Sequence, residues 1–241
     1  MDERISVQDL HIQYADVVAV RSATFTVGPG EVLGLLGGNG AGKSSTLRAV
    51  AGVYPVRGGR LFVAGHDMGD PSEANLGRKK LGYCPDVGGL LRSTTPRDHI
   101  EYALRNRGRK DLIPKAHALV DLFDLGYVMD RATIGFSHGM CRRLSVLLAA
   151  VTATDVLVLD EPFDGVDPTG VKATFDVVQE AKAQGCGILV STHLLNLLTD
   201  LCDRIAVMRL GELVEVVPAA MYAGEAGATR YEHLLRAAVA A

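Results

Sequence analysis

The stretch GGNGAGKS, residues 37–44, has the residue types and spacing of a phosphate-binding loop, G-x-x-x-x-G-K-[ST]. Its glycines permit positive φ angles and close backbone approach, so successive N–H groups can surround a phosphate at the start of a helix. Lys43 is expected to reach the β- and γ-phosphates of a nucleotide, and the Ser44 hydroxyl to bind Mg²⁺. A glycine-rich turn with an exposed lysine is the weaker alternative. The predicted cradle comprises Gly37, Gly38, Asn39, Gly40, Ala41, Gly42, Lys43 and Ser44.

Two adjacent acids, Asp160 and Glu161, follow the apolar run VLVL at residues 156–159. A phosphate-binding loop also needs an acid to hold the metal, and Asp160 is expected to bind Mg²⁺ directly or through water. Glu161 is the candidate base that orients the attacking water. Without the loop at 37–44, ordinary solvated charge at a strand end would be the preferred interpretation of this pair. With the loop, the catalytic interpretation is preferred.

The segment GFSHGMCRRLSVLL, residues 135–148, places a small polar cluster directly before an amphipathic helical pattern. Ser137 is predicted to cap that helix, its hydroxyl accepting from a backbone N–H that the helix cannot satisfy. A Ser-His hydrolase site is less favoured, because adjacent residues do not face each other on a helix and no G-x-S-x-G turn surrounds them. The cap by itself therefore assigns no function to the segment.

The elements that must position these residues alternate between strands and helices. Residues 31–36, EVLGLL, are apolar on both faces and predict a strand in the middle of a parallel sheet. The loop at 37–44 follows this strand and precedes a helical pattern, which is the context that a phosphate-binding loop requires. Further strands are predicted at about 5–12, 24–27, 61–64, 155–160, 187–192, 204–208 and 212–216, with helical patterns between them.

A helical subdomain is predicted inside an α/β core. Residues 96–153 carry no good strand pattern and show helical periodicity, for example at Ala116, Leu119 and Phe123. We therefore predict one domain over the whole chain, 1–241. Within it we expect a core with a β subdomain at about 1–90 and 154–217, a helical subdomain at about 91–153, and a tail at 218–241 that ends in a short helix from 231.

Composition excludes several classes of protein. With 48% hydrophobic and 22% charged residues, the chain of 241 residues is expected to fold around a sizeable core. A net charge of −3 does not favour a nucleic-acid or anionic-lipid surface. Neither a signal peptide nor a membrane span is expected, because the N-terminus is acidic and no long apolar run occurs. The spacing of four cysteines supports neither a zinc site nor a disulfide framework: Cys84, Cys141, Cys186 and Cys202.

Taken together, the motifs resemble those of the nucleotide-binding subunit of an ATP-binding cassette (ABC) transporter, over roughly residues 14–215. GGNGAGKSSTL is similar to the Walker A loop, which adds Ser45 to the cradle, and VLVLDEP is similar to the Walker B strand with its catalytic glutamate. The resemblance implies a P-loop NTPase fold, that is, a mostly parallel sheet with an antiparallel β subdomain and an inserted helical subdomain. It further implies ATP as substrate, Mg²⁺ as cofactor, and roles for Lys43 and Glu161 in hydrolysis.

Other matched positions carry further expectations from the resemblance. FDGVDP is similar to the family's D-loop and places Asp167 at the matching position, while VSTH ends in His193, the position of the switch histidine. Tyr14 stands where the family has an aromatic ring that stacks on adenine, although an ordinary half-buried strand tyrosine is as good an interpretation locally. FSHGM resembles the LSGGQ signature. By that resemblance, Ser137 and the N–H of Gly139 contact a γ-phosphate held by a second subunit in a head-to-tail dimer.

Two positions depart from the family pattern. His138 stands in the signature where glycine is usual, which adds a side chain near the nucleotide. In LGYCPD, Asp86 stands where the family has a glutamine that contacts Mg²⁺ or water and senses the transmembrane partner. An aspartate can still ligate Mg²⁺, so Asp86 is expected at the metal together with Ser44 and Asp160, but its reach and hydrogen bonding differ from those of the amide.

The segments GYCPD, FSHGMCRRLSVLLAAV and HLLNLLTDLCDRIAVMRLGELVE look most like the ATPase subunits of ABC-2-type exporters. This implies a separate membrane permease, a second ABC ATPase subunit in a homodimer or heterodimer, and a location on the cytoplasmic face of the cell membrane through the permease. No nucleic-acid partner is expected. Two alternatives stay open: an ATP-gated regulatory subunit with weak hydrolysis paired with another ABC ATPase, and a soluble ABC ATPase without a transport role.

Overall fold

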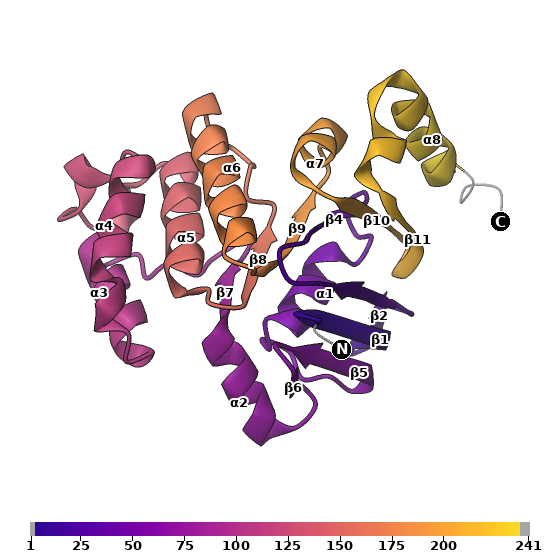
Figure 1. The fold of residues 1–241 in the computed structure, drawn as a ribbon, viewed down its shortest axis with the longest axis horizontal. Helices are drawn as coiled ribbons and strands as arrows, with labels where there is room; N and C mark the ends of the chain where they lie inside the picture. Colours follow the sequence, from indigo (N-terminus) through magenta and orange to yellow (C-terminus); the bar gives the residue numbers. More distant parts are fainter. Residues whose placement is uncertain (1–2, 237–241) are drawn as a thin grey trace.

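The computed structural model, which describes residues 3–236, contains two sheets and a set of helices that pack against them (Figure 1). Within these residues the larger sheet has six strands in the order β11-β10-β4-β9-β8-β7. Its strands are parallel except for β11, which pairs antiparallel with β10. The bounds are β4 (Val32–Leu36), β7 (Leu81–Cys84), β8 (Val156–Asp160), β9 (Gly187–Thr192), β10 (Arg204–Arg209) and β11 (Glu212–Pro218).

The second sheet is antiparallel and built from the N-terminal part of the chain. Strand β1 (Ile5–Tyr14) lies at its centre and pairs with three neighbours. These are β2 (Val17–Val20), β3 (Phe25–Val27) and β5 (Gly58–Val63), and β5 pairs in turn with β6 (His66–Asp67). The mostly parallel sheet with an antiparallel β subdomain is thereby confirmed.

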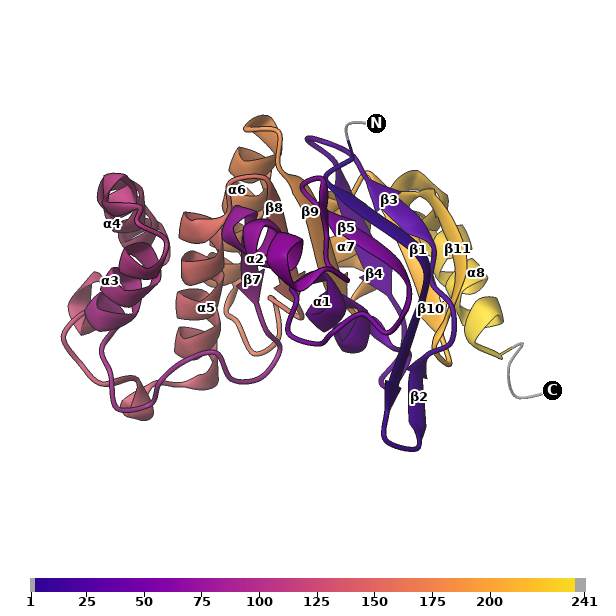
Figure 2. The ribbon, with the colours of Figure 1, turned by 90° about the horizontal axis from the view of Figure 1, so that it is seen from below.

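The helices are α1 (Lys43–Val50), α2 (Pro71–Lys80), α3 (Pro96–Asn106), α4 (Ile113–Leu122), α5 (His138–Thr152), α6 (Pro168–Ala183), α7 (Leu195–Leu201) and α8 (Gly224–Arg236). Short 3₁₀ turns occur at η1 (Lys110–Leu112), η2 (Gly126–Val128), η3 (Thr133–Gly135) and η4 (Ala219–Tyr222). Helices α3 and α4 lie on the far side of α5 from the large sheet (Figure 2). Residues 96–153 are thus helical, as the periodicity predicts.

The two faces of the large sheet pack into two separate cores. Along β4, Leu33 and Leu35 pack with the antiparallel sheet and α1, whereas Val32 and Leu36 pack with the layer of α5 and α6. This alternation follows from the two-residue period of a strand. Because both faces are covered, every residue of β4 is buried and the strand consists of apolar residues and one glycine.

Three strands were not expected from the sequence: β2, β6 and β7. Each has four residues or fewer and lacks a clear alternation of apolar and polar residues, whereas the equally short β3, Phe-Thr-Val, shows that alternation. In β7, Gly82 also interrupts the apolar run, and its presence has a tertiary cause. A Cβ at Gly82 would collide with the Ala149 carbonyl oxygen, so glycine lets α5 lie directly on this strand.

The C-terminal helix starts earlier than expected. Helix α8 begins at Gly224 and not at 231, and residues 237–241 of the expected helix lie outside the described residues. The four cysteines are free thiols, of which Cys84 and Cys186 are buried. Of the helices in residues 3–236, none combines the length and apolar character needed to cross a membrane.

Candidate functional site

The phosphate-binding loop connects the carboxyl end of β4 to the start of α1. Gly40 and Gly42 adopt φ angles of 78° and 103°, in the left-handed region that glycine alone enters freely. At Gly42 the packing adds a second reason for glycine, since a Cβ there would lie 2.7 Å from the Ala19 carbonyl oxygen. The loop thus leads into the N-terminus of α1, where unpaired N–H groups favour an anion.

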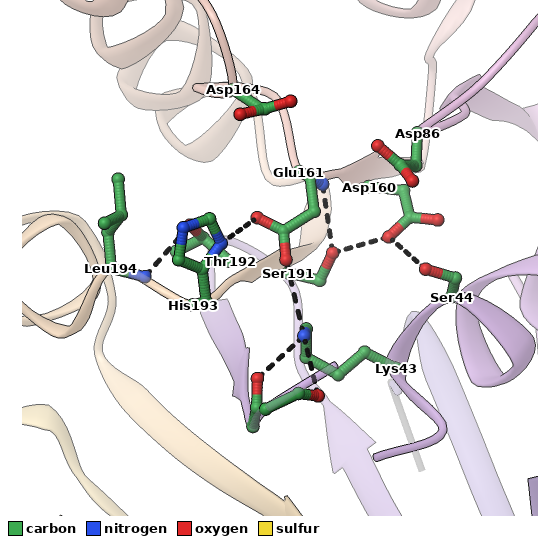
Figure 3. A network of polar contacts seen from close by, with 12 residues as sticks. Lys43, Ser44, Asp86, Asp160, Glu161, Asp164, Ser191, Thr192, His193 and Leu194 are labelled. Atoms are coloured by element: carbon green, nitrogen blue, oxygen red, sulfur yellow. Dashed lines mark hydrogen bonds and ion pairs between the residues drawn. The ribbon is translucent and has the colours of Figure 1, made fainter. Parts of the chain in front are cut away.

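Lys43 is the first residue of α1, and only 6% of its surface is exposed. Its ammonium donates to the carbonyl oxygens of Gly37 at 2.7 Å and Gly38 at 3.4 Å. It also forms an ion pair with Oε1 of Glu161 at 3.3 Å (Figure 3). The lysine is therefore held against the loop that it is expected to serve, in direct contact with the candidate base.

Asp160, at the carboxyl end of β8, is fully buried, and only one of its two carboxylate oxygens has hydrogen-bond partners among the described residues. Its Oδ1 accepts from the hydroxyls of Ser44 at 3.1 Å and Ser191 at 2.7 Å. Its Oδ2 is buried and, within the described residues, has no hydrogen-bond partner. Burial raises the pKa of Asp160, and the two hydroxyl hydrogen bonds oppose that rise.

These oxygens fit a divalent cation. A buried carboxylate oxygen without a partner is costly unless a ligand satisfies it, and Mg²⁺ takes carboxylate and hydroxyl oxygens. Ser44 and Asp160 touch each other at this point, as the sequence predicts for two metal ligands. Asp86, the third predicted ligand, is drawn beside Asp160 in Figure 3. One of its oxygens, Oδ1, accepts from Arg142 at 3.2 Å.

Glu161 adopts a left-handed backbone conformation with φ of 47°, which is unusual for a residue with a side chain. Its N–H is fixed by the carbonyl oxygen and the hydroxyl of Ser191, at 3.1 and 3.0 Å. Its carboxylate lies between Lys43 and His193, whose Nδ1 is 3.2 Å from Oε2. Ser191 thus fixes the backbone of Glu161, while Lys43 and His193 hold its carboxylate in one place, as a water-orienting base requires.

A cavity of about 430 Å³ lies beside this network. The ring of Tyr14 lines it and packs edge-on against Tyr54, with ring centroids 4.8 Å apart. Asp86 and Glu161 line it as well. The predicted site residues that line the cavity are Tyr14, Gly38, Asn39, Gly40, Ala41, Gly42, Lys43, Ser44, Ser45, Asp86 and Glu161. Gly37, Asp160 and His193 join the same region through the hydrogen bonds and ion pairs described above.

Besides Gly37, Asp160 and His193, three further predicted residues do not line this cavity: Ser137, Gly139 and Asp167. Ser137 caps α5 and accepts from the Met140 N–H at 3.2 Å, which is the cap that the sequence predicts. Asp167 caps α6 and accepts from the Gly170 N–H at 2.8 Å. A Cβ at Gly139 would lie 2.7 Å from the carbonyl oxygen of Gly165, so the two segments pack tightly together within the chain.

Two residues of the site were missed from the sequence. Ser191 lies directly opposite Asp160 in the register of β8 and β9, and its hydroxyl contacts both acids of the pair. Arg142 donates to the carbonyl oxygens of Pro85 and Asp160 from inside the protein. A signal for Arg142 was present, because it is a charged residue on the face of α5 that otherwise carries buried side chains.

A family model described as "ABC transporter" matches residues 20–164. The chain is 34% identical over 226 residues to "Nod factor export ATP-binding protein I" of Sinorhizobium fredii, which covers 91% of this chain and 64% of that relative. The chain thus spans somewhat less than two thirds of that relative's length.

Solved structures share the fold. "Structure of ATP binding subunit of ABC transporter" superimposes with a TM-score of 0.83 at 28% identity, covering 90% of this chain and 91% of that one. A dimeric bacterial ABC transporter cassette superimposes with a TM-score of 0.80 at 17% identity, covering 89% of this chain and 98% of that one. At the latter identity the likeness concerns the fold alone.

Proposed function

The chain belongs to the ABC transporter family as an ATP-binding ATPase domain, and we propose that it hydrolyses ATP at the Lys43 cavity to drive a separate membrane permease of the ABC-2 export type. One observation carries this proposal. The candidate base Glu161 is held between Lys43 and His193, and it directly follows Asp160, whose Oδ2 is buried without a hydrogen-bond partner among the described residues. A candidate base, a cation and a candidate metal ligand thus belong to one region, and this supports hydrolysis of a phosphate bond there.

In the proposed complex, the loop at 37–44 and the N-terminus of α1 bind the phosphates through backbone N–H groups and Lys43. The ring of Tyr14 packs on the base of ATP at the other end of the cavity. Ser44 and Asp160, with Asp86, hold Mg²⁺, which supplies neutralisation of the negative charge on the phosphates when it is bound. Positioning and charge stabilisation are then in place before water attacks.

Hydrolysis in this proposal depends on Glu161. When the ammonium of Lys43 pairs with the phosphate, Oε1 of Glu161 loses its ion pair with Lys43. This oxygen then becomes available to accept a hydrogen bond from water. His193 holds Oε2 and so keeps the carboxylate aimed at the γ-phosphate. The oriented water then attacks the γ-phosphorus in line with the bond that joins it to ADP, and this bond breaks as ADP leaves.

Ser137, Gly139 and Asp167 take part through a second cassette. ABC ATPase cassettes form dimers, and a fold neighbour of this chain is a dimeric cassette. In a head-to-tail pair, the capped N-terminus of α5 faces the γ-phosphate bound by the other subunit, where its N–H groups and positive end stabilise charge. A homodimer is the simplest form of this arrangement, and a heterodimer satisfies the same geometry.

We assign permease docking to an apolar groove of about 500 Å³ beside Asp86. Tyr83, Pro85 and Leu90 line it, and Val87 at its rim is 76% exposed. An apolar segment of the permease bound there would contact Pro85 and Val87, the neighbours of Asp86. This contact could shift Asp86 and thereby alter the metal site. Through this contact the chain would lie on the cytoplasmic face of the membrane. The proposed function involves no nucleic-acid partner.

A regulatory role with weak hydrolysis is the second candidate. It is favoured by Asp86 and His138, which stand where the family pattern has an amide and a glycine. In that case the chain pairs with a different, catalytically stronger ABC ATPase.

Affinity purification of the tagged chain from detergent-solubilised membranes tests the proposal. Recovery of a multi-span membrane protein, with ATP hydrolysis that this partner stimulates, is the expected result. Recovery of a soluble partner alone would overturn the transport role. If a second, different cassette is recovered with the permease, the regulatory candidate gains support, whereas recovery of this cassette alone indicates a homodimer.

A further inference from the structure

Arg142 is a buried cation that connects three parts of the site. It lies in the first turns of α5 and is only 4% exposed. Its guanidinium donates to the carbonyl oxygens of Pro85 at 2.7 Å and Asp160 at 3.3 Å. It also donates to the carbonyl oxygen of Asp86 at 2.6 Å and to Oδ1 of Asp86 at 3.2 Å. One side chain thus ties α5, whose N-cap is Ser137, to the loop after β7 and to the end of β8.

The counter-charge of this buried cation comes from Asp86. Among residues 3–236, Asp86 is the carboxylate that lies within ion-pair distance of Arg142. A buried guanidinium is strongly destabilised when its charge partner is lost, because carbonyl oxygens alone offer partial charges. The residue that departs from the family pattern is therefore also the one that neutralises Arg142.

Asp86 faces two sides at once. It lines the nucleotide cavity together with Lys43 and Glu161, and it also lines a smaller cavity of about 120 Å³ beside α5 together with Arg142. Asp86 lies beside the predicted metal ligand Asp160 in Figure 3, while its Oδ1 is held by Arg142 of α5.

We propose that Arg142 is a positioning residue that shares the Asp86 carboxylate with Mg²⁺ and so passes the state of the metal site to α5. While Asp86 Oδ1 pairs with Arg142, that oxygen is withheld from the metal and the loop after β7 is tied to α5. When Oδ1 turns to the metal instead, Arg142 loses its counter-charge and holds the loop less firmly. This inference rests on the proposed function, because it needs nucleotide and Mg²⁺ at the Lys43 cavity.

The first test measures the Mg²⁺ concentration that half-saturates binding of a fluorescent, non-hydrolysable ATP analogue. Arg142→Gln frees the Asp86 carboxylate from its ion pair, which competes with Mg²⁺ for the same oxygen. The half-saturating Mg²⁺ concentration is therefore expected to fall about fivefold, a factor typical of the loss of one partly exposed ion pair. In the Asp86→Gln background, adding Arg142→Gln is expected to change nothing, because no carboxylate is left to release. An unchanged midpoint in folded Arg142→Gln, or the same shift in both backgrounds, would overturn the proposal.

Arg143→Gln is the matched control for this measurement. Arg143 is the next residue of the same helix, is partly buried, and donates to the Phe123 carbonyl oxygen at 3.1 Å. It makes a structural hydrogen bond of similar kind but has no contact with Asp86 among those described. Its replacement should lower stability without moving the Mg²⁺ midpoint. A shift equal to that of Arg142→Gln would indicate a general effect of weakening α5 and would count against the pair.

A second measurement leaves Arg142 in place, because its removal strands several carbonyl oxygens and can prevent folding. Hydrogen exchange is followed by mass spectrometry with the ATP analogue bound, at a protein concentration where the chain is monomeric. Adding Mg²⁺ is expected to speed exchange in the first turns of α5 in the unmodified chain and to have no such effect in Asp86→Gln. An equal response in both proteins would overturn the proposal.

Failure of the proposed function and failure of the Arg142 role alone give different results. If the unmodified chain binds no nucleotide, the proposed function fails and the role of Arg142 fails with it. If nucleotide binds with Mg²⁺ but neither measurement responds to the Asp86–Arg142 pair, the role of Arg142 alone is refuted.

Discussion

The nucleotide cradle and the signature end of α5 differ in how completely one chain builds them. In the cradle, Lys43 and Asp160 are buried and are joined through Glu161, Ser44 and Ser191 by hydrogen bonds and an ion pair. At the signature end, Ser137 is exposed, and the side chains of His138 and Asp164 are 59% and 56% exposed where they pair at 3.3 Å. One region is organised within the protomer, whereas the other faces solvent.

This difference predicts where each region acts. Donors and charges that are already fixed in a buried site act strongly on a ligand without further reorganisation. An exposed helix N-terminus acts weakly until a second surface excludes water from it. We therefore expect substitutions in the cradle to alter nucleotide binding or hydrolysis, and substitutions at the signature end to weaken dimer formation while the affinity of the monomer for ATP stays unchanged.

The largest effect is expected for Glu161→Gln. The amide keeps the shape of the side chain but cannot accept a proton, so hydrolysis should fall about 10²- to 10⁴-fold. ATP-bound dimers should accumulate, as seen by size-exclusion chromatography with light scattering. Glu180→Gln, an exposed glutamate on α6, is the control and should leave both readouts unchanged. A Glu161→Gln protein that stays monomeric when saturated with ATP would contradict the two-fold arrangement.

Lys43→Ala should weaken ATP binding about 10- to 100-fold, the range for charge-assisted hydrogen bonds to a phosphate. The loss should be visible in the monomer, because Lys43 belongs to the region that one chain completes. Titration with a fluorescent ATP analogue measures it. Lys172→Ala is the control, since that side chain is 81% exposed and pairs only with its helix neighbour Asp176 among the described residues. Equal affinities for the two variants would refute the assignment of the cradle.

Ser137→Ala should separate the two regions. Loss of the cap should cost about 1 kcal/mol of unfolding free energy, leave monomer affinity for ATP unchanged, and weaken ATP-driven dimerisation about tenfold in the Glu161→Gln background. Thr95→Ala removes the comparable cap of α3 and serves as the control. It should show a similar stability loss with no change in dimerisation. If both variants weaken the dimer equally, helix stability and not the signature contact explains the result.

The smallest effect is expected for the His138–Asp164 pair. Because both side chains are mostly exposed, a double-mutant cycle with His138→Gly and Asp164→Ala should give a coupling below about 1 kcal/mol in monomer stability. Chemical denaturation measures it. A coupling several times larger would show that this end of α5 is also pre-built within one chain, and would erase the contrast between the two regions.

How far the site could be predicted depends on the length of its patterns. The loop at 37–44 was predictable because its glycine spacing lies in one short segment, flanked by a buried strand and a helix. The caps at Ser137 and Asp167 involve N–H groups only three residues away, so local chemistry was enough to predict the former. Strand β7 was not predictable, since one of its four residues is Gly82, which is needed only because α5 packs directly against this strand.

The amino-acid sequence by itself determined the phosphate-binding loop, the acidic pair at 160–161 and the strands that present them, because these depend on backbone freedom and apolar periodicity within a few neighbouring residues. Only the tertiary structure decided that Ser191 holds both acids, that Arg142 pairs with Asp86 across 56 positions, and that Ser137 lies away from the cavity. These outcomes depend on the register of parallel strands and on the packing of α5 against them. Neither is encoded in a local pattern, because both follow from contacts between segments far apart in the chain.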